Sequence, residues 1–507
     1  MVTPIPHGHI THKLKRSLLA VVGLGLVAAG LLALTVSLIN YNIEQTAARS
    51  KQLALDNVTI LLEAQQKFSL PEDTSYVPSA LDPATLVTVV AKNQPAVVRI
   101  VAMYCADIAL QSTKSNVVFD DRCGGKVGSG SFISSDGYIA TSGHVATVNP
   151  KKAFVESLTG VEDIDAYLGF LVTNRYISSA KSKVLKSDMA AEKAGAQEAF
   201  DATIDLIPDS QFSASAATMQ YAVQLSNIPI QIDEVDNRLD LRFGKTVIEA
   251  TLIDQDFDEA TSDAALASGQ FTSSDVALLK AEGSFPFIRL GSIETVKPGD
   301  QLTAIGFPSA INGVDSELTQ QIPSITQGKV KGITKDANVG GRNIIATTVP
   351  IGQGNSGGPA INDSGEQIGL NTYSVLECPD LKCYGDGQVR DIADIKALLD
   401  KNGIRLQAGG VSDDWSAGLD AYVKGDYNEA LRLFTKVQAA YPANYLVPSF
   451  LSVARAQVGS ATDASSSYQA RTTLVNALIV LAAVGFIAVV VIGILIIHFT
   501  RQHRRQS

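Results

Sequence analysis

A serine and a histidine, far apart in the chain, have the clearest chemical role in this sequence. Ser356 lies among glycines in G-N-S-G-G-P, and His144 lies in T-S-G-H-V. All other histidines fall within the first 12 or the last 10 residues. A neutral imidazole is the usual base that makes a serine hydroxyl nucleophilic near neutral pH. We therefore expect His144 to be the general base for a nucleophilic Ser356.

The glycines around Ser356 predict a second part of the same chemistry. Gly354 and Gly357 let the backbone turn sharply, so that the N–H groups of Gly354 and Ser356 converge as an oxyanion hole. An ordinary glycine-rich turn is the alternative. The nucleophile elbow of an α/β hydrolase is excluded, because that fold places its histidine after the serine, and only the two C-terminal histidines follow Ser356.

An imidazole base also needs a partner that fixes its tautomer, and a carboxylate is the usual one. Asp275 in S-S-D-V-A-L-L-K stands at the start of a predicted buried strand, from which it can face the imidazole. A solvated aspartate at a strand end is the alternative. The rival candidates in the same region are Asp254, Asp256, Asp258 and Asp263.

Short β-branched runs separated by turn residues must position these groups. Asp136 and Gly137 predict a tight hairpin between residues 131–134 and 138–141, directly before His144. A mainly β fold, a barrel or sandwich, is therefore predicted. Further predicted strands are A-V-V-R-I-V-A, R-L-D-L-R-F, T-V-I-E-A-T-L-I, D-V-A-L-L-K and Q-L-T-A-I-G-F.

Residues from about 151 to 227 differ from their surroundings. They are rich in Ala, Glu, Lys and Gln, with few β-branched runs. This composition predicts a mainly helical insertion within the β domain. A further helix is expected near residues 392–402.

Two long apolar runs, 17–39 and 474–497, can each cross a hydrocarbon layer of about 30 Å. Basic residues precede the first run and follow the second, so the positive-inside rule places residues 1–16 and the basic tail 498–507 in the cytoplasm. Residues 40–80 are predicted to form a stalk and linker outside. A cleaved signal peptide is the alternative for the first run.

The charge of the segment between these runs limits its partners. Residues 1–40 and 471–507 hold 7 of the 41 Lys and Arg and no acidic residue, so residues 41–470 carry 34 basic against 51 acidic side chains, a net charge of −17. Such a segment is unsuited to nucleic acid or anionic lipid. No nucleic-acid partner is expected.

All four cysteines lie in this outer segment, where an oxidising compartment permits disulfides. Three pairings are open to four cysteines. We favour the local pairs Cys105 with Cys123 and Cys378 with Cys383, because each closes a polar loop. No histidine lies near either pair, so no zinc site is expected, and neither a metal nor an organic cofactor is predicted.

Three motifs in this order resemble the HtrA (Deg) family of trypsin-like serine proteases: G-S-G-S-F-I-S-S-D-G-Y-I-A-T-S-G-H-V, S-S-D-V-A-L-L-K and G-Q-G-N-S-G-G-P-A-I-N. The resemblance implies a protease domain over residues 81–404, built as two six-stranded β-barrels with the site in the cleft between them. It gives His144 the role of general base, Asp275 that of its orienting partner and Ser356 that of nucleophile, and it makes Gly354 and Ser356 the oxyanion donors.

The same resemblance bears on substrate preference. In trypsin-like folds the residue six before the serine lies at the base of the primary pocket, and here it is Pro350. No carboxylate is present at this position to bind a Lys or Arg side chain of a substrate. With Ile351 nearby, the pocket is expected to accept small or medium apolar side chains.

The chain also departs from the family pattern. His144 and Asp275 are 131 positions apart because the insertion lies between them, and no PDZ domain is recognisable. A homo-oligomer is therefore left open. Residues 411–460 instead resemble one tetratricopeptide repeat, which would pack on a helix over 445–458 or on a protein partner. A plain helical spacer is the alternative. The matching residues are Gly418, Tyr422, Gly425, Tyr427, Ala430, Phe434 and Pro442.

These features together predict a membrane-anchored extracytoplasmic serine endopeptidase. Its expected substrates are polypeptides, either misfolded or specific envelope proteins. The competing hypothesis is a catalytically inactive scaffold that uses the same barrels and repeat to bind polypeptides at the membrane.

Overall fold

A computed structural model describes most of the chain from residue 86 onward. The described ranges are 86–235, 238–258, 273–307, 321–336, 341–352, 354–375, 385–460 and 462–465, with scattered positions in 23–56 and 470–502. Most of the predicted membrane runs, Cys378 and Cys383 lie outside them. Where helices are described, none combines the length and apolar character that crossing a bilayer requires.

The chain divides into two compact units, and the larger comprises Leu55–Leu419 with Leu433–Phe450. All contacts discussed below lie within this larger unit. Two closed barrels of six strands each form its main body, so the mainly β prediction is confirmed.

The first barrel has the strand order β1-β2-β3-β8-β7-β4, and each neighbouring pair is antiparallel. Alternating or fully apolar runs fill its interior with buried side chains such as Ile100, Phe132 and Leu279. Its strands are β1 (Val97–Gln111), β2 (Asn116–Phe132), β3 (Tyr138–Thr141), β4 (Phe212–Gln224), β7 (Val247–Asp256) and β8 (Val276–Ala281).

The second barrel has the order β10-β11-β14-β13-β12-β9. Ile345, Val349 and Ile368 are completely buried in its core. Its strands are β9 (Gln301–Gly306), β10 (Ser324–Asp336), β11 (Arg342–Ile351), β12 (Pro359–Asn362), β13 (Gln367–Val375) and β14 (Gly385–Asp391).

Helix α9 (Ala393–Lys401) follows the second barrel and joins the two cores. Its buried residues Ile395 and Leu398 belong to one apolar cluster with Ile133 and Leu278 of the first barrel. The helix predicted near residues 392–402 is thereby found. A two-stranded sheet of β5 (Ile232–Val235) and β6 (Arg238–Leu241) and the short η5 (Ile293–Thr295) complete this part.

The predicted hairpin before His144 is present, with β2 pairing β3 from Gly130 opposite Thr141. Its turn needs a glycine at position 137, where φ is 102° and a Cβ would lie 2.0 Å from the carbonyl oxygen of Ala281. The turn thus lies against the end of strand β8, and β3 then pairs with β8 from Tyr138 opposite Lys280 to Thr141 opposite Ala277.

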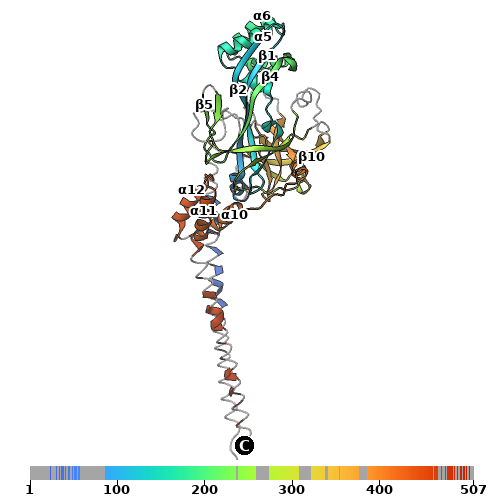
Figure 1. The fold of residues 1–507 in the computed structure, drawn as a ribbon. Helices are drawn as coiled ribbons and strands as arrows, with labels where there is room; N and C mark the ends of the chain where they lie inside the picture. The colour runs from blue at the N-terminus through green and yellow to red at the C-terminus, as the bar shows by residue number, and fades with distance from the viewer. Residues whose placement is uncertain are drawn as a thin grey trace, which may run out of the picture. The chain divides into compact units, whose positions relative to one another are not determined.

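The insertion is helical in its first part only. Its helices pack against the outer ends of β1 and β2 and share a core of their own, which includes Phe154, Tyr167 and Phe200. Figure 1 shows α5 and α6 at the far end of these long strands. The helices are α4 (Pro150–Glu156), α5 (Val161–Thr173), α6 (Ser179–Ala190), α7 (Ala196–Asp201), η3 (Ala202–Leu206) and η4 (Asp209–Gln211).

The prediction of a mainly helical insertion over about 151–227 holds up to residue 211, but its last part was wrong, because residues 212–224 form strand β4. This stretch is rich in Ser and Ala, which have weak strand preference, so its composition does not predict a strand. Pairing with β1, from Phe212 opposite Leu110 to Gln224 opposite Arg99, overrides that preference.

The C-terminal helices are α10 (Gly410–Val423), α11 (Tyr427–Ala440) and α12 (Val447–Gln457). Trp415, Phe434 and Phe450 pack their rings together, with centroids 5.3 to 5.5 Å apart. The indole N–H of Trp415 donates to the carbonyl of Ala91, 2.7 Å away. Ala91 is the last residue of η1 (Leu86–Ala91), which leads through η2 (Gln94–Ala96) into β1. The hydrogen bond from Trp415 therefore connects these aromatic residues to the start of the first barrel.

A disulfide joins Cys105 to Cys123, which face each other on β1 and β2.

Replacing both cysteines by serine removes a cross-link that closes a loop of 18 residues. We expect the free energy of unfolding to fall by about 3 kcal/mol. Urea unfolding followed by circular dichroism measures this. Wild-type protein in reductant should match the double variant, and a midpoint unaffected by reductant would contradict the prediction.

Candidate active site

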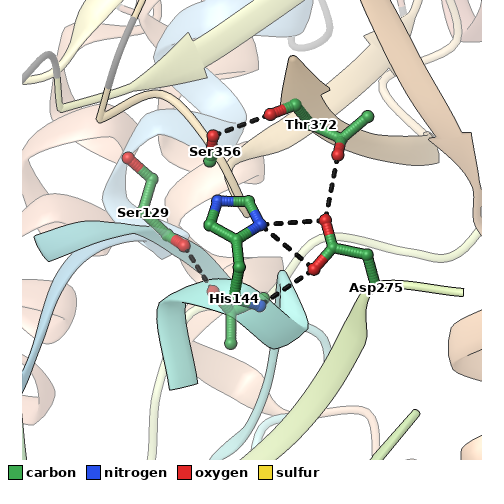
Figure 2. Close-up of polar contacts among 6 residues, drawn as sticks. Ser129, His144, Asp275, Ser356 and Thr372 are labelled. Carbon is green, nitrogen blue, oxygen red and sulfur yellow. Dashed lines mark hydrogen bonds and ion pairs between the residues drawn. The ribbon is translucent and has the colours of Figure 1, made fainter. Parts of the chain in front are cut away.

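The structure brings His144 and Asp275 into direct contact (Figure 2). His144 lies in the short helix α3 (Gly143–Ala146), directly after β3, and its side chain is 39% exposed. Its Nδ1 lies 2.9 Å from Oδ2 and 3.0 Å from Oδ1 of Asp275. The backbone N–H of His144 donates to the same carboxylate at 2.8 Å. This arrangement fixes the ring through Nδ1, so the role of base would fall to Nε2.

Asp275 precedes β8, and its side chain is only 17% exposed. Burial by itself raises the pKa of the Asp275 carboxyl, but the His144 imidazole and hydrogen bonds from His144 and Thr372 lower it further, so the net pKa lies below the ordinary value. The carboxylate is therefore charged at neutral pH and stays so into the acidic range. A charged partner is what an imidazole needs when it accepts a proton.

Ser356 lies in the turn before β12, between glycines with left-handed backbones, Gly354 (φ 88°) and Gly357 (φ 83°). Ser129 of strand β2 holds this turn from the first barrel. Its N–H donates to the carbonyl of Ser356 at 2.9 Å, and its hydroxyl donates to the carbonyl of Gly354 at 2.7 Å. A Cβ on Gly357 would lie 2.3 Å from the carbonyl oxygen of Ser129, so this position requires glycine.

The peptide groups of this turn explain how an oxyanion hole can form. The carbonyl of Asn355 accepts from the N–H of Gly358 at 3.0 Å. Since the two ends of a peptide group point in opposite directions, the N–H of Ser356 faces the other way. Among the described residues, neither Gly354 nor Ser356 donates its N–H to a backbone carbonyl. An oxyanion hole needs two such donors that converge on one point.

The hydroxyl of Ser356 donates to the backbone carbonyl of Thr372 in β13, 2.8 Å away. Figure 2 shows Ser356 beside the imidazole ring, with Asp275 on the other side of that ring. The hydroxyl of Thr372 in turn donates to Oδ2 of Asp275 at 3.1 Å. Thr372 thus contacts both Ser356 and Asp275, a role that its local sequence does not indicate.

Pro350 and Ile351, which the sequence predicts to line the primary pocket, end strand β11. The carbonyl of Pro350 accepts from the Thr326 hydroxyl at 2.7 Å. Ile351 is buried in the core of the second barrel and lies against the backbone of Gly387, where a Cβ would be 2.3 Å from its terminal methyl. The surroundings of Ile351 are therefore apolar.

The described rivals of Asp275 have other partners. Asp254 accepts from Lys401 and Asn402, and Asp256 accepts from Ser274. Asp258 is exposed, and Asp263 lies outside the described residues. His144 contacts the carboxylate of Asp275.

Comparisons with known proteins extend this picture. A family model described as a trypsin-like peptidase domain matches residues 234–370, which include Asp275 and Ser356. A probable periplasmic serine endoprotease, DegP-like, from Ectopseudomonas mendocina (strain ymp) is 42% identical over 100 residues, 20% of this chain and 19% of the relative. The serine protease HTRA1 of Xenopus tropicalis is 38% identical over 105 residues, 20% of this chain and 21% of the relative.

These matches show that part of the chain is similar to HtrA/DegP-like and trypsin-like serine proteases. The chain spans about a fifth of the length of the curated relatives it matches. A solved HtrA-type protease, AlgW with a decapeptide, is 16% identical, with 62% of this chain and 67% of that chain covered and a TM-score of 0.33.

In a trypsin-like site, replacing Asp275 by asparagine leaves the shape but lets the imidazole adopt the wrong tautomer. We expect kcat on an unfolded protein substrate to fall by about three to four orders of magnitude, with little change in thermal stability. Parallel kinetics and unfolding scans measure both. An Asp275→Asn enzyme with wild-type kcat would exclude Asp275 as the partner of the base.

Replacing Thr372 by valine keeps the side-chain shape but removes the hydroxyl that donates to Asp275. A hydrogen bond to a charged group contributes about 1.5–3 kcal/mol, so we expect kcat to fall at least about tenfold. Thr372→Ser retains the donor and is the matched control. Equal rates for the valine and serine variants would show that the hydroxyl has no positioning role.

Proposed function

We propose that this chain is a serine endopeptidase that hydrolyses polypeptides through an acyl-enzyme intermediate. One observation carries the proposal: the His144–Asp275 pair lies beside Ser356. His144, Asp275 and Ser356 lie, in this order, in the three sequence motifs that resemble the family. The matches to serine endoproteases support the reaction class.

In the first half of the proposed reaction, Oγ of Ser356 attacks the carbonyl carbon of the scissile amide and its proton passes to Nε2 of His144. The carbonyl oxygen becomes an oxyanion, to which Gly354 and Ser356 donate their N–H groups. Asp275 stabilises the imidazolium that results. The imidazolium then protonates the leaving amine nitrogen as the C–N bond breaks, which leaves an acyl ester on Ser356.

In the second half, His144 removes a proton from water, and the hydroxide oxygen attacks the ester carbon. The ester C–O bond breaks, Oγ regains its proton from His144, and the peptide acid leaves. The resting hydroxyl donates to Thr372, and one proton cannot serve two acceptors. Attack therefore requires the Ser356 hydroxyl to release the Thr372 carbonyl and turn to His144.

The substrates are proposed to be misfolded or specific envelope polypeptides, cut after small or medium apolar side chains. The absence of a carboxylate at Pro350 supports this preference. Several relatives are named as periplasmic endoproteases, which favours an extracytoplasmic location. The two apolar runs of the sequence, 17–39 and 474–497, are proposed to anchor the enzyme in a membrane.

The C-terminal helices are proposed to form a tetratricopeptide-like repeat that contacts a protein partner. The close packing of Gly418 against Phe434 supports this idea, because a Cβ at Gly418 would lie 2.6 Å from the Phe434 ring. Both residues fit the repeat pattern, in which small residues let two helices approach each other.

A labelling experiment tests the proposed chemistry. A fluorophosphonate probe should label the wild-type protein on Ser356, and Ser356→Ala should abolish labelling. His144→Ala should lower the labelling rate by several orders of magnitude, because the serine then lacks its base. Incubation of the same proteins with an unfolded substrate, followed by mass spectrometry of the fragments, gives the cleavage sites.

The expected fragments end in small or medium apolar residues. Cuts clustered after Lys or Arg would contradict the pocket assignment without affecting the reaction class. A folded wild-type protein that neither labels nor cleaves would contradict the proposed enzyme and favour the polypeptide-binding scaffold.

A further inference from the structure

The backbone of Asp275 has a conformation that its neighbours must hold in place. Its φ is 55°, in the left-handed region that non-glycine residues seldom adopt. Such a conformation persists only where the surrounding structure determines it, and it is often found at functional sites. Because Asp275 orients His144, whatever holds this backbone also sets the geometry of the base.

Asp256, at the end of strand β7, holds the residue directly before Asp275. Its Oδ2 accepts from the backbone N–H of Ser274 at 3.1 Å and from the Ser274 hydroxyl at 2.5 Å. Asp256 also pairs with Val276 in the β7–β8 ladder, and Val276 is completely buried. The backbone is thus fixed on both sides of Asp275.

Arg342, at the start of β11, reaches this carboxylate from the second barrel. Its Nη1 lies 2.9 Å from Oδ2 of Asp256, the same oxygen that accepts from Ser274, and 3.1 Å from Oδ1 of Asp394 in the first turn of α9. Asp394 is the more buried of the two carboxylates, with 14% of its side chain exposed against 37% for Asp256. Arg342 therefore belongs to the second barrel, pairs with α9 through Asp394, and places its guanidinium against Asp256 of the first barrel.

We propose that Arg342 is a positioning residue for the catalytic pair, acting through Asp256 and Ser274 on the backbone of Asp275. This inference rests on the proposed serine endopeptidase function. The arginine makes the orientation of Asp275 depend on contact between the barrels, so that the base in the first barrel is aligned only when the barrel carrying Ser356 is docked.

A second ion pair on the same strand distinguishes positioning from simple attachment. Asp254 of β7 lies 2.8 Å from Nζ of Lys401, at the end of α9. This pair also joins β7 to α9, but among the described residues its hydrogen bonds are not to Ser274 or Asp275. The Lys401 side chain is 64% exposed, and ion pairs at the surface contribute little to stability, so removing this cation should leave the fold intact. Lys401→Ala is therefore the matched control. Arg342 lies between two partly buried carboxylates, so Arg342→Lys, which keeps the cation, is tested beside Arg342→Ala.

The test compares wild type, Arg342→Ala, Arg342→Lys, Lys401→Ala and Ser274→Ala in the full chain, with cleavage of a fluorogenic peptide and thermal unfolding as readouts. We expect Arg342→Ala to lower kcat about tenfold to a hundredfold, the range for a misplacement of about 1 Å, with KM unchanged. Arg342→Lys should recover part of the loss. Ser274→Ala should lower kcat with an unchanged midpoint of unfolding, and Lys401→Ala should behave as wild type.

Equal kcat values for Arg342→Ala and Lys401→Ala would overturn the proposal. If Arg342→Ala fails to fold, the folded Arg342→Lys and Ser274→Ala variants decide: reduced kcat at constant KM supports the proposal, and wild-type kcat in both overturns it. If the wild type is active and the variants have wild-type kcat, the positioning role is contradicted and the proposed function is not. A folded wild type without activity contradicts the proposed function, and the positioning role with it.

Discussion

The contact between the Asp275 carboxylate and the His144 imidazole is the interaction on which the rest of the site depends. Burying a carboxylate costs free energy unless hydrogen bonds compensate for the lost water. Asp275 accepts from the backbone and ring of His144, which belong to the first barrel, and from Thr372 of the second. The charged form is therefore stabilised by both barrels together, and its pKa stays low although burial opposes this.

The same dependence on both barrels governs the nucleophile. The turn that carries Ser356 belongs to the second barrel, yet Ser129 of the first barrel binds two of its carbonyls. The hydroxyl of Ser129 also accepts from the backbone N–H of Phe307, beyond β9, at 2.7 Å. The close approach of Gly357 to Ser129 and Thr141 leaves no room for a side chain. The glycines around the serine therefore allow the barrels to touch, in addition to letting the chain turn.

The sequence predicted the residues that have a distinctive type and local pattern. His144 is the only histidine outside the chain ends, and glycines mark Ser356, so the sequence predicts both together with their surrounding strands. Thr372 and Arg342 could not be found in this way, because a threonine in a strand and an arginine at a strand start are ordinary residues. Their roles arise from contacts across the barrel interface that no local pattern records. Strand β4 was missed for a related reason, since its pairing with β1 overrides a Ser- and Ala-rich composition.

His144 and Asp275 are in contact although they are 131 positions apart, because the insertion begins and ends beside the first barrel. It leaves after helix α3 and returns as β4, which pairs with both β1 and β7. The hydroxyl of Tyr221 in β4 donates to the carbonyl of Ala146, 2.9 Å away, at the end of the helix that carries His144. A longer loop costs little once its ends are fixed, and the helices bury a core of their own. The insertion can therefore be large, while its returning strand supports the base.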